Sequence, residues 1–528
     1  MAVGEAEGEA GGGPDRAPPR SALITGRRFL PLFAVQALGA FNDNVFKNAF
    51  VTLLTFKLAT EMGLSEAELG ALVAVAAAVF ILPFALFAPM AGQIADWIDK
   101  ARMMRAVKFV EIILMIVAAI AYHVQSISLL YALLFLMGAQ SAFFSPIKYG
   151  VLPRYLADDE LVQGNGLIQG ATFLSILLGT IAGVQLIQTD AGVLLVSIAV
   201  ITIAVIGFIA SLYAPPAPPA AEEKAHLLPN LGLRLTPQSR RATIGAAFFI
   251  ALGVALAAAA LSFIEPGSLF YPARYAVAGL ALLFGLSLHV LWPSIAASIE
   301  AAQERPVVWR TLLAIAWFWF AAAGFMTVIP VLVSETLYAD EDVFTLLLAA
   351  FSIGVAIGAS LVSILQRGRI QVGVAPIGAF GIAIFAIDVY LGLGAGLPPP
   401  DPSDPEIRRT LSEFLSSPVG WRVLIDFMGL AICAGLFVTP LNAIYQHNAP
   451  PEAVGRVVAA SNMLDSALMA FSSVVVILLQ SALGFGQPAV LATLGATGLV
   501  TAVVVARWSP ETRLGRFVLR YLPRRAEG

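Results

Sequence analysis

A cluster of polar and charged side chains interrupts the first long apolar segment of this chain. Residues 29–56 are long enough to span a bilayer, yet they contain Asn42, Asp43, Asn44 and Lys47. Ionisable side chains at such a depth almost always face the interior of a helix bundle, a water-filled cavity or one another. The cluster therefore predicts a binding site, in which the carboxylate binds an ammonium group and the amides bind a phosphate or a hydroxyl group.

The spacing of the two charged residues also suggests an internal ion pair. Asp43 and Lys47 are four residues apart, so on a helix they share one face and can pair. The alternative to a binding site is thus a neutralised pair that fixes this helix against a neighbour. The accompanying amides supply more hydrogen-bonding capacity than such a latch needs, which favours the binding site.

A second acidic position lies in a late apolar segment. Asp465 follows Asn462 and lies well inside the segment near 457–484. We expect both residues to face Asp43 across a cavity, where two acids and one lysine would leave a net negative charge. Such a site suits an ammonium group and could hold a coupling proton or Na⁺. The alternative is an Asp465 carboxylate that is paired with Arg456 or solvated.

The composition shows what kind of protein must position these residues. Of 528 residues, 59% are hydrophobic and only 12% are charged, and the mean hydropathy is +0.85. Soluble domains contain about 25% charged residues, so this is a polytopic membrane protein. The single cysteine, Cys433, excludes a disulfide framework and a cysteine-built metal site.

Hydropathy windows of spanning length predict an all-α protein of two six-helix lobes with two further helices between them, about 14 spans in total. The first six apolar segments lie near 29–56, 69–91, 106–122, 127–145, 166–188 and 191–213, and the last six near 309–333, 343–365, 372–394, 422–446, 457–484 and 487–507. The inserted pair lies near 242–264 and 274–293.

The distribution of basic residues orients the chain. With the N-terminus in the cytoplasm, 25 of the 31 Lys and Arg residues, Lys108 among them, fall on that side, which predicts cytoplasmic termini. Glu111 lies about a turn and a half into the third segment, where we expect it to reach the cytoplasmic cluster of Arg105 and Lys108. The predicted organisation is a disordered cytoplasmic tail (1–28), an N-terminal lobe (29–213), a cytoplasmic linker (214–241), the inserted helix pair (242–293), a C-terminal lobe (306–507) and a basic cytoplasmic tail (508–528). An outer loop at 395–420 is unusually long.

The turn after the second segment resembles the loop signature of the major facilitator superfamily. The matching residues are Gly92, Asp96, Lys100 and Arg102, although Trp97 stands where the family has an arginine. The resemblance implies a cytoplasmic gate in which Asp96 pairs with cationic side chains. The alternative is a tight basic turn that only satisfies the charge asymmetry.

Several short phrases resemble one family in particular, the lysophospholipid transporters. They include Phe41 to Asn44, Gly92 to Asp96 and Ile176 to Gly179, together with family-motif residues Ser145, Pro146, Lys148, Tyr149, Gly150, Asn165, Pro440 and Asn442. The resemblance implies a major facilitator fold that moves lysophospholipid, chiefly lysophosphatidylethanolamine, inward across the bacterial inner membrane by alternating access. The lipid is then reacylated by an acyltransferase and an acyl-carrier-protein ligase.

One feature departs from that family. Its members carry an arginine in the seventh segment, and residues 309–333 have none beyond Arg310 at the very start. Phosphate recognition would then depend on Lys47 or Lys148. The alternative for Lys148 is a positive anchor at the cytoplasmic end of its segment.

The sequence does not favour an enzyme. No histidine has an aspartate five residues later, as acyltransferases need, and no phosphate-binding loop is present. We therefore predict a transporter without a cofactor or metal, apart from a coupling ion, and without a nucleic-acid partner. The acyltransferase and ligase would be separate polypeptides. Two other functions stay open: a proton-coupled exporter of amphiphilic drugs, and a non-transporting lipid sensor or scaffold.

Overall fold

The computed structural model describes residues 23–55, 66–219, 292, 294–366, 369–393 and 408–508. This part of the chain is helical apart from one isolated bridge between Ala339 and Arg409, which confirms the predicted all-α class. The N-terminal long helices are α2 (Leu30–Leu53), α4 (Glu66–Trp97), α5 (Lys100–His123), α6 (Ile127–Tyr155), α7 (Asp158–Ile187) and α8 (Gly192–Leu212). The C-terminal ones are α11 (Pro306–Val331), α12 (Glu341–Gln366), α13 (Ala375–Leu393), α15 (Pro418–Asn448), α16 (Val454–Ser481) and α17 (Gln487–Arg507), with the short η2 (Leu332–Thr336) and α14 (Leu411–Ser416).

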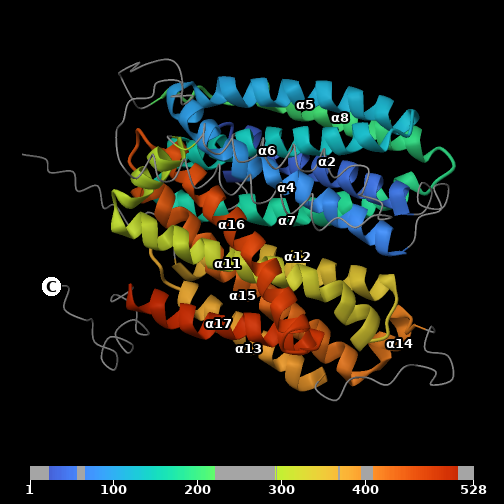
Figure 1. The fold of residues 1–528 in the computed structure, drawn as a ribbon. Coiled ribbons are helices and arrows are strands. Elements are labelled where there is room, and N and C mark those ends of the chain that lie inside the picture. The colour runs from blue at the N-terminus through green and yellow to red at the C-terminus, as the bar shows by residue number, and fades with distance from the viewer. Residues whose placement is uncertain are drawn as a thin grey trace, which may run out of the picture.

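These helices form two lobes of six that repeat one packing scheme (Figure 1). In the N-terminal lobe α2 packs on α7, α4 on α6, and α5 on α8; in the C-terminal lobe the equivalent pairs are α11 with α16, α12 with α15, and α13 with α17. The lobes meet along two seams that are equivalent under the repeat, α4 with α16 and α7 with α12. A two-fold repeat of this kind places a shared site between the halves.

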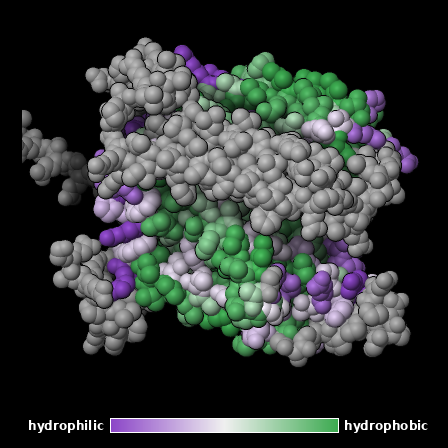
Figure 2. Space-filling view, viewed as in Figure 1, coloured by the Kyte–Doolittle hydropathy of each residue, from purple (hydrophilic) through white to green (hydrophobic). Residues whose placement is uncertain are grey.

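The helices are built for a bilayer. Among the described residues ten helices are long and apolar enough to span a membrane. Figure 2 shows hydrophobic residues over the top and the lower centre of the coloured surface, and hydrophilic ones mainly toward its left and right sides, where the helices end. Helices α2 and α5, which carry the charged residues described below, are not among these ten. The predicted pair at 242–293 lies outside the described residues apart from Trp292, so the count of 14 spans stays a prediction.

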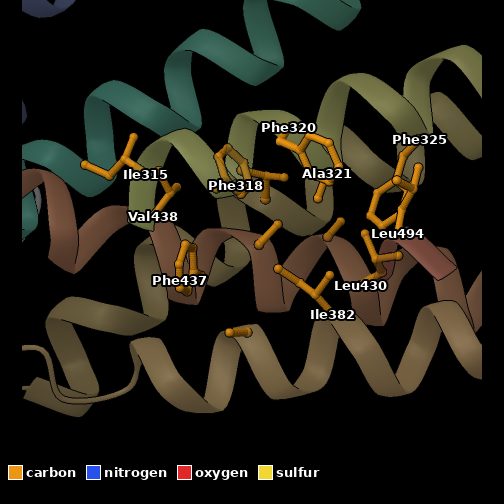
Figure 3. Packing of buried hydrophobic residues seen from close by; sticks show 14 of the residues in the cluster. Ile315, Phe318, Phe320, Ala321, Phe325, Ile382, Leu430, Phe437, Val438 and Leu494 are labelled. Atoms are coloured by element: carbon orange, nitrogen blue, oxygen red, sulfur yellow. The ribbon is translucent and has the colours of Figure 1, made fainter. Parts of the chain in front are cut away.

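The core of the C-terminal lobe is formed by interdigitated aromatic and aliphatic side chains (Figure 3). Phe318 of α11 is 3% exposed, and its ring centroid lies 6.4 Å from that of Phe437 on α15. Close approach of backbones adds to this packing: a Cβ atom at Gly378 would lie 2.6 Å from the carbonyl oxygen of Cys433. Since lipid is as apolar as these side chains, tight van der Waals contact and not expulsion from water holds the helices together.

The two connecting segments are described only in part. The start of the linker is fixed to the N-terminal lobe, because Asp99 accepts a hydrogen bond from the backbone of Ala217 and Arg105 donates to the carbonyl of Ala214. The described end of the outer loop contains α14, which begins at a capping box. The backbone and hydroxyl of Thr410 donate to Glu413 and lower the pKa of that carboxyl. The tails and the remainder of both connections lie outside the described residues.

Candidate functional site

A cavity of about 340 Å³ lies between the lobes. Its walls come from α2, α4, α5, α6 and α7 on one side and from α11, α15 and α16 on the other. The walls are mainly apolar, with aromatic residues such as Phe80, Phe84 and Trp319, and a small number of charged and amide side chains converge on them. This combination is typical of a ligand site that binds an apolar body and orients a polar group.

Asp43 lines this cavity, but its predicted ion pair with Lys47 is wrong. The Asp43 carboxylate accepts a hydrogen bond of 2.9 Å from the hydroxyl of Ser141 on α6. The Lys47 ammonium instead lies 5.8 Å from the centroid of the Phe80 ring and is not among the cavity-lining residues. An i,i+4 spacing permits pairing but does not compel it, and here a neighbouring helix supplies each side chain with another partner.

Of the two amides next to Asp43, only Asn44 lines the cavity. Asn42 is fully buried on another face of α2, where its side-chain amide donates 3.0 Å to Glu111 of α5. The prediction that Asn42 contacts substrate is therefore not supported by its position. The side-chain amide of Asn44 donates a hydrogen bond to the carbonyl oxygen of Ala40 on the same helix.

Glu111 is the centre of a buried network, of which the sequence predicted only the contact with Lys108. One of its oxygens accepts from Asn42, and the other accepts 2.6 Å from Lys108 and 3.0 Å from Gln140. Glu111 is 3% and Lys108 1% exposed, so a charged pair is buried with hydrogen bonds on both carboxylate oxygens. This is the arrangement in which a buried ion pair is tolerated. The network ties α2, α5 and α6 together behind Asp43.

The C-terminal lobe contributes the predicted pair Asn462 and Asp465 to the same cavity. One Asp465 oxygen accepts a 3.3 Å hydrogen bond from Ser461, and the other is buried without a partner among the described residues. Asn462 donates 2.9 Å to Ser145 across the lobe boundary. The alternative in which Arg456 pairs with Asp465 is wrong, because Arg456 binds Asp96.

Two lysines, Lys108 and Lys148, line the cavity. The Lys148 ammonium lies 4.4 Å from the centroid of the Tyr149 ring. It is therefore a cavity residue and not a surface anchor. Lys108 was expected among the basic residues at the cytoplasmic boundary, within reach of Glu111. Its contact with Glu111 is confirmed, but its place in the cavity wall was not predicted. Lys47, the third candidate cation, lies outside the cavity wall.

The gate predicted around Asp96 joins the two lobes. Its carboxylate accepts from the backbone of Gly455 at 2.6 Å and of Arg456 at 3.1 Å, and from the Arg456 side chain at 3.3 Å. These amides lie in the first turn of α16, so an acid of one lobe caps a helix of the other. To the described residues of the other lobe, Lys100 and Arg102 donate no side-chain hydrogen bond. Lys100 donates to the carbonyl of Ala95, and the Arg102 side chain is exposed.

Two glycines allow this approach. A Cβ atom at Gly92 would lie 2.5 Å from the carbonyl oxygen of Gly455, and one at Gly455 would lie 2.7 Å from the Asp96 carboxylate. We call this end of the molecule, which carries the α4–α5 turn, the gate end. It is the end that the charge distribution predicts to be cytoplasmic.

The second seam is closed at the gate end as well. The side-chain amides of Asn165 on α7 and Gln446 on α15 exchange two hydrogen bonds of 2.9 Å. Nearby, Asp158 lies 3.1 Å from His447. These hydrogen bonds between the lobes, like that of Asn462 with Ser145, lie in the gate-end half of their helices. They hold the two lobes together at the gate end.

The remaining family-motif residues lie in α6 and α15. Asn442 lines the cavity and Tyr149 lies 3.5 Å from Gln169. Pro146 and Pro440 lie inside α6 and α15. A Cβ atom at Gly150 would lie 2.9 Å from the Lys100 side chain.

Comparison with known proteins agrees with this architecture. Residues 32–473 match the family model "Major Facilitator Superfamily". Several curated relatives are named "Lysophospholipid transporter LplT". The chain is 27% identical to that of Serratia proteamaculans over 247 residues, which are 45% of this chain and 58% of the relative. It is 31% identical to that of Escherichia fergusonii over 185 residues, 35% of this chain and 42% of the relative.

These matches span about two fifths to three fifths of the curated relatives' length. Solved structures match more fully in fold alone. The human organic anion transporter MFSD10 aligns with a TM-score of 0.60 at 14% identity, covering 93% of this chain and 100% of its own. The proton:xylose symporter XylE aligns with a TM-score of 0.58 at 12% identity, covering 93% and 96%.

Proposed function

Since the chain belongs to the major facilitator superfamily and is a multi-pass membrane transporter similar to the LplT proteins, we propose that it carries lysophospholipids, with lysophosphatidylethanolamine as the principal substrate. The observation that carries this proposal is the cavity itself, in which side chains of both charge signs converge inside a mainly apolar wall. A lysophospholipid has the matching parts: a zwitterionic headgroup and one acyl chain.

The polar side of the cavity suits the headgroup. Asp43 and Asp465 supply carboxylates for an ammonium group from the two lobes, and Asn44 and Asn462 supply amides. One oxygen of Asp465 has no partner among the described residues, so it is ready to accept a hydrogen bond from a ligand. A buried carboxylate in this condition gains stability when a cation arrives.

The acyl chain would lie against the aromatic wall. Phe80 and Phe84 come from α4, and Met469 comes from α16, the helix across the seam from α4. The chain can therefore stay in an apolar environment while the headgroup occupies the polar side. This division lets an amphiphile cross without exposing its apolar part to water.

Transport would proceed by rocking of the two lobes about this site. In the described conformation the gate end is held closed by the hydrogen bonds of Asp96, on α4, to the first turn of α16, and by the Asn165–Gln446 pair. Opening the gate end requires both sets of hydrogen bonds to break, while new contacts form at the opposite end. A proton or Na⁺ bound at the two acids would couple this change to an ion gradient.

We place the protein in a bacterial inner membrane with both termini in the cytoplasm, where the imported lipid would be reacylated by a separate acyltransferase and acyl-carrier-protein ligase. The test is uptake of labelled lysophosphatidylethanolamine into spheroplasts that express this chain and lack their own lysophospholipid carrier. We expect saturable uptake above the empty-vector control. Absent uptake with active extrusion of cationic amphiphilic drugs would replace the proposal by a drug exporter, and absence of both would favour a lipid sensor.

A further inference from the structure

The buried Lys108–Glu111 pair lies next to the cavity and is not explained by packing alone. Lys108 belongs to α5, which packs on α8 and α6 in the N-terminal lobe, yet its side chain reaches the cavity wall. It does so beside Gly39 of α2, where an added Cβ atom would lie 2.5 Å from the ammonium nitrogen. Any side chain larger than that of glycine would compete with the ammonium group for this space.

We propose that Lys108 is the cation that binds the phosphate of the substrate headgroup, and that it is presented through the gap at Gly39. This assignment rests on the proposed function and specifies the chemistry of the same site. An ammonium group has three N–H donors. One binds Glu111 at 2.6 Å, and no other hydrogen bond is formed by Lys108 among the described residues. The ammonium also lies 5.4 Å from the centroid of the Phe144 ring, which lines the cavity. Two donors are thus left without a hydrogen-bond acceptor and are available to a ligand.

Glu111 lowers the free-energy cost of burying this cation when no substrate is bound. A lone ammonium buried at this depth would be strongly unfavourable, and the carboxylate offsets its charge. Glu111 is itself held by Asn42 and Gln140, so it cannot rotate toward the cavity without losing two hydrogen bonds. The lysine is therefore positioned before the substrate arrives, which reduces the ordering cost of binding.

The position of Lys108 relative to Asp43 fits a zwitterion. Its ammonium lies beside residue 39 of α2, and Asp43 is four residues further along the same helix, about 6 Å by helical rise. A positive and a negative group one helical turn apart can bind the phosphate and the ammonium of one ethanolamine headgroup. Lys148 is the competing cation. Both ammonium groups lie over an aromatic ring, Phe144 for Lys108 and Tyr149 for Lys148, but among the described residues only Lys108 has a carboxylate that fixes its position.

The assignment is tested by direct binding to the purified full chain in nanodiscs, using three lipids with the same acyl chain. Lysophosphatidylethanolamine carries phosphate and ammonium, monoacylglycerol phosphate carries phosphate alone, and monoacylglycerol carries neither. For Lys108→Gln we expect affinity for both phosphate lipids to fall roughly tenfold or more, as for loss of a charge-assisted hydrogen bond, with no change for monoacylglycerol. Lys148→Gln should leave the preference for phosphate lipids in place.

A glycine pair keeps the test valid if Lys108→Gln fails to fold. Gly39→Ala retains every charge and displaces the ammonium, so the preference for phosphate lipids should fall. Gly207→Ala, on α8 beside the same side chain, places its Cβ atom 3.9 Å from the Lys108 stem, an ordinary contact, and should bind all three lipids as the wild type does.

The outcomes separate the two proposals. Wild-type binding of the phosphate lipids with unchanged preference in both Lys108→Gln and Gly39→Ala would overturn the assignment of Lys108 and leave the proposed function standing. A wild-type protein that prefers neither phosphate lipid over monoacylglycerol would overturn both.

Discussion

The side chains around Asp43 show how an ionisable residue is kept inside a membrane protein. Asp43 is held by Ser141 at 2.9 Å and faces the cavity, while the adjacent Asn42 faces the Glu111 network on the other side of α2. Adjacent residues on one helix thus have different surroundings: Asn42 belongs to the buried Glu111 network, and Asp43 lines the cavity. Among the described residues Asp43 has no salt-bridge partner on its own helix, which suits the role that we propose for it in binding a substrate ammonium group.

Asp43→Asn should abolish transport, because the amide cannot offset a substrate ammonium charge, while insertion into the membrane is retained. The measurement is initial uptake of labelled lysophosphatidylethanolamine, normalised to protein in the membrane. Asp190→Asn is the matched control, since Asp190 is exposed in the turn between α7 and α8, and it should transport normally. Unchanged uptake by Asp43→Asn would reassign the cluster to a structural latch.

Glu111→Ala should destabilise the protein, since it leaves the Lys108 ammonium buried without a counter-charge. Breaking a buried pair in this way costs about 3–5 kcal/mol, whereas breaking an exposed one costs about 0–1 kcal/mol. Arg422→Ala is the comparison, because Arg422 pairs with Asp388 in a contact that is nearly half exposed. Thermal unfolding in detergent should show a clearly larger fall in Tm for Glu111→Ala. Equal shifts for the two variants would mean that the buried pair contributes no more than a surface one.

At the scale of the elements, the gate depends on how closely α4 and α16 approach. Asp96 caps the first turn of α16, and Gly92 and Gly455 remove the side chains that would hold these helices apart. The helix N-terminus carries partial positive charge, so it is stabilised by the carboxylate of the opposite lobe. Moving the lobes apart at this end leaves both the acid and the amides without partners until water reaches them.

Gly455→Ala should weaken the closed gate, because its Cβ atom would meet backbone of α4 and the Asp96 carboxylate. The probe is Ser466→Cys, at a residue that lines the cavity, in a Cys433→Ser background. Its rate of reaction with an impermeant maleimide, added on the gate side, reports how accessible the cavity is from the gate end. We expect faster labelling in Gly455→Ala than in Gly170→Ala, whose Cβ atom would lie 3.5 Å from Ala356 at the other seam, an ordinary contact. Equal labelling in the two variants would contradict the role given to this approach.

The elements themselves were largely predictable, whereas the contacts between them were not. Apolar runs identify the spans, and the polar residues in 29–56 identify α2 as a helix that lines a cavity. The partner of Asn42 is 69 residues away on α5, and that of Asp96 is about 360 residues away on α16. No local pattern carries such pairings. The same limit applies to Asp43 and Lys47, whose spacing permits a pair that does not form, and to Lys108, which was expected at the cytoplasmic boundary and lies in the cavity wall.

At the scale of the whole molecule, the repeated packing of the two lobes explains why one cavity receives residues from both. Each lobe contributes an acid, Asp43 from the first helix of its lobe and Asp465 from the fifth. A ligand bound between them contacts both lobes at once, so a rocking motion can carry its surroundings from one side to the other. The sequence supported this plan through its six-plus-six count, and the equivalent helix pairs support it in three dimensions.

The predicted orientation is a property of the whole chain and can be tested by reporters at its C-terminus. With an even number of spans and a cytoplasmic N-terminus, a fused green fluorescent protein should fluoresce. A fused alkaline phosphatase, which needs an oxidising compartment, should be inactive. Active phosphatase with a dark fluorescent protein would reverse the orientation and with it the side on which the gate end lies.

The most direct test of the central claim uses the purified protein in liposomes with no other component. Labelled lysophosphatidylethanolamine is added outside, and the label that becomes protected from an impermeant quencher or from extraction by albumin is followed with time. We predict protection far faster in wild-type than in protein-free liposomes, with Asp43→Asn at the protein-free rate. Wild-type protein that moves this lipid no faster than empty liposomes would contradict the account.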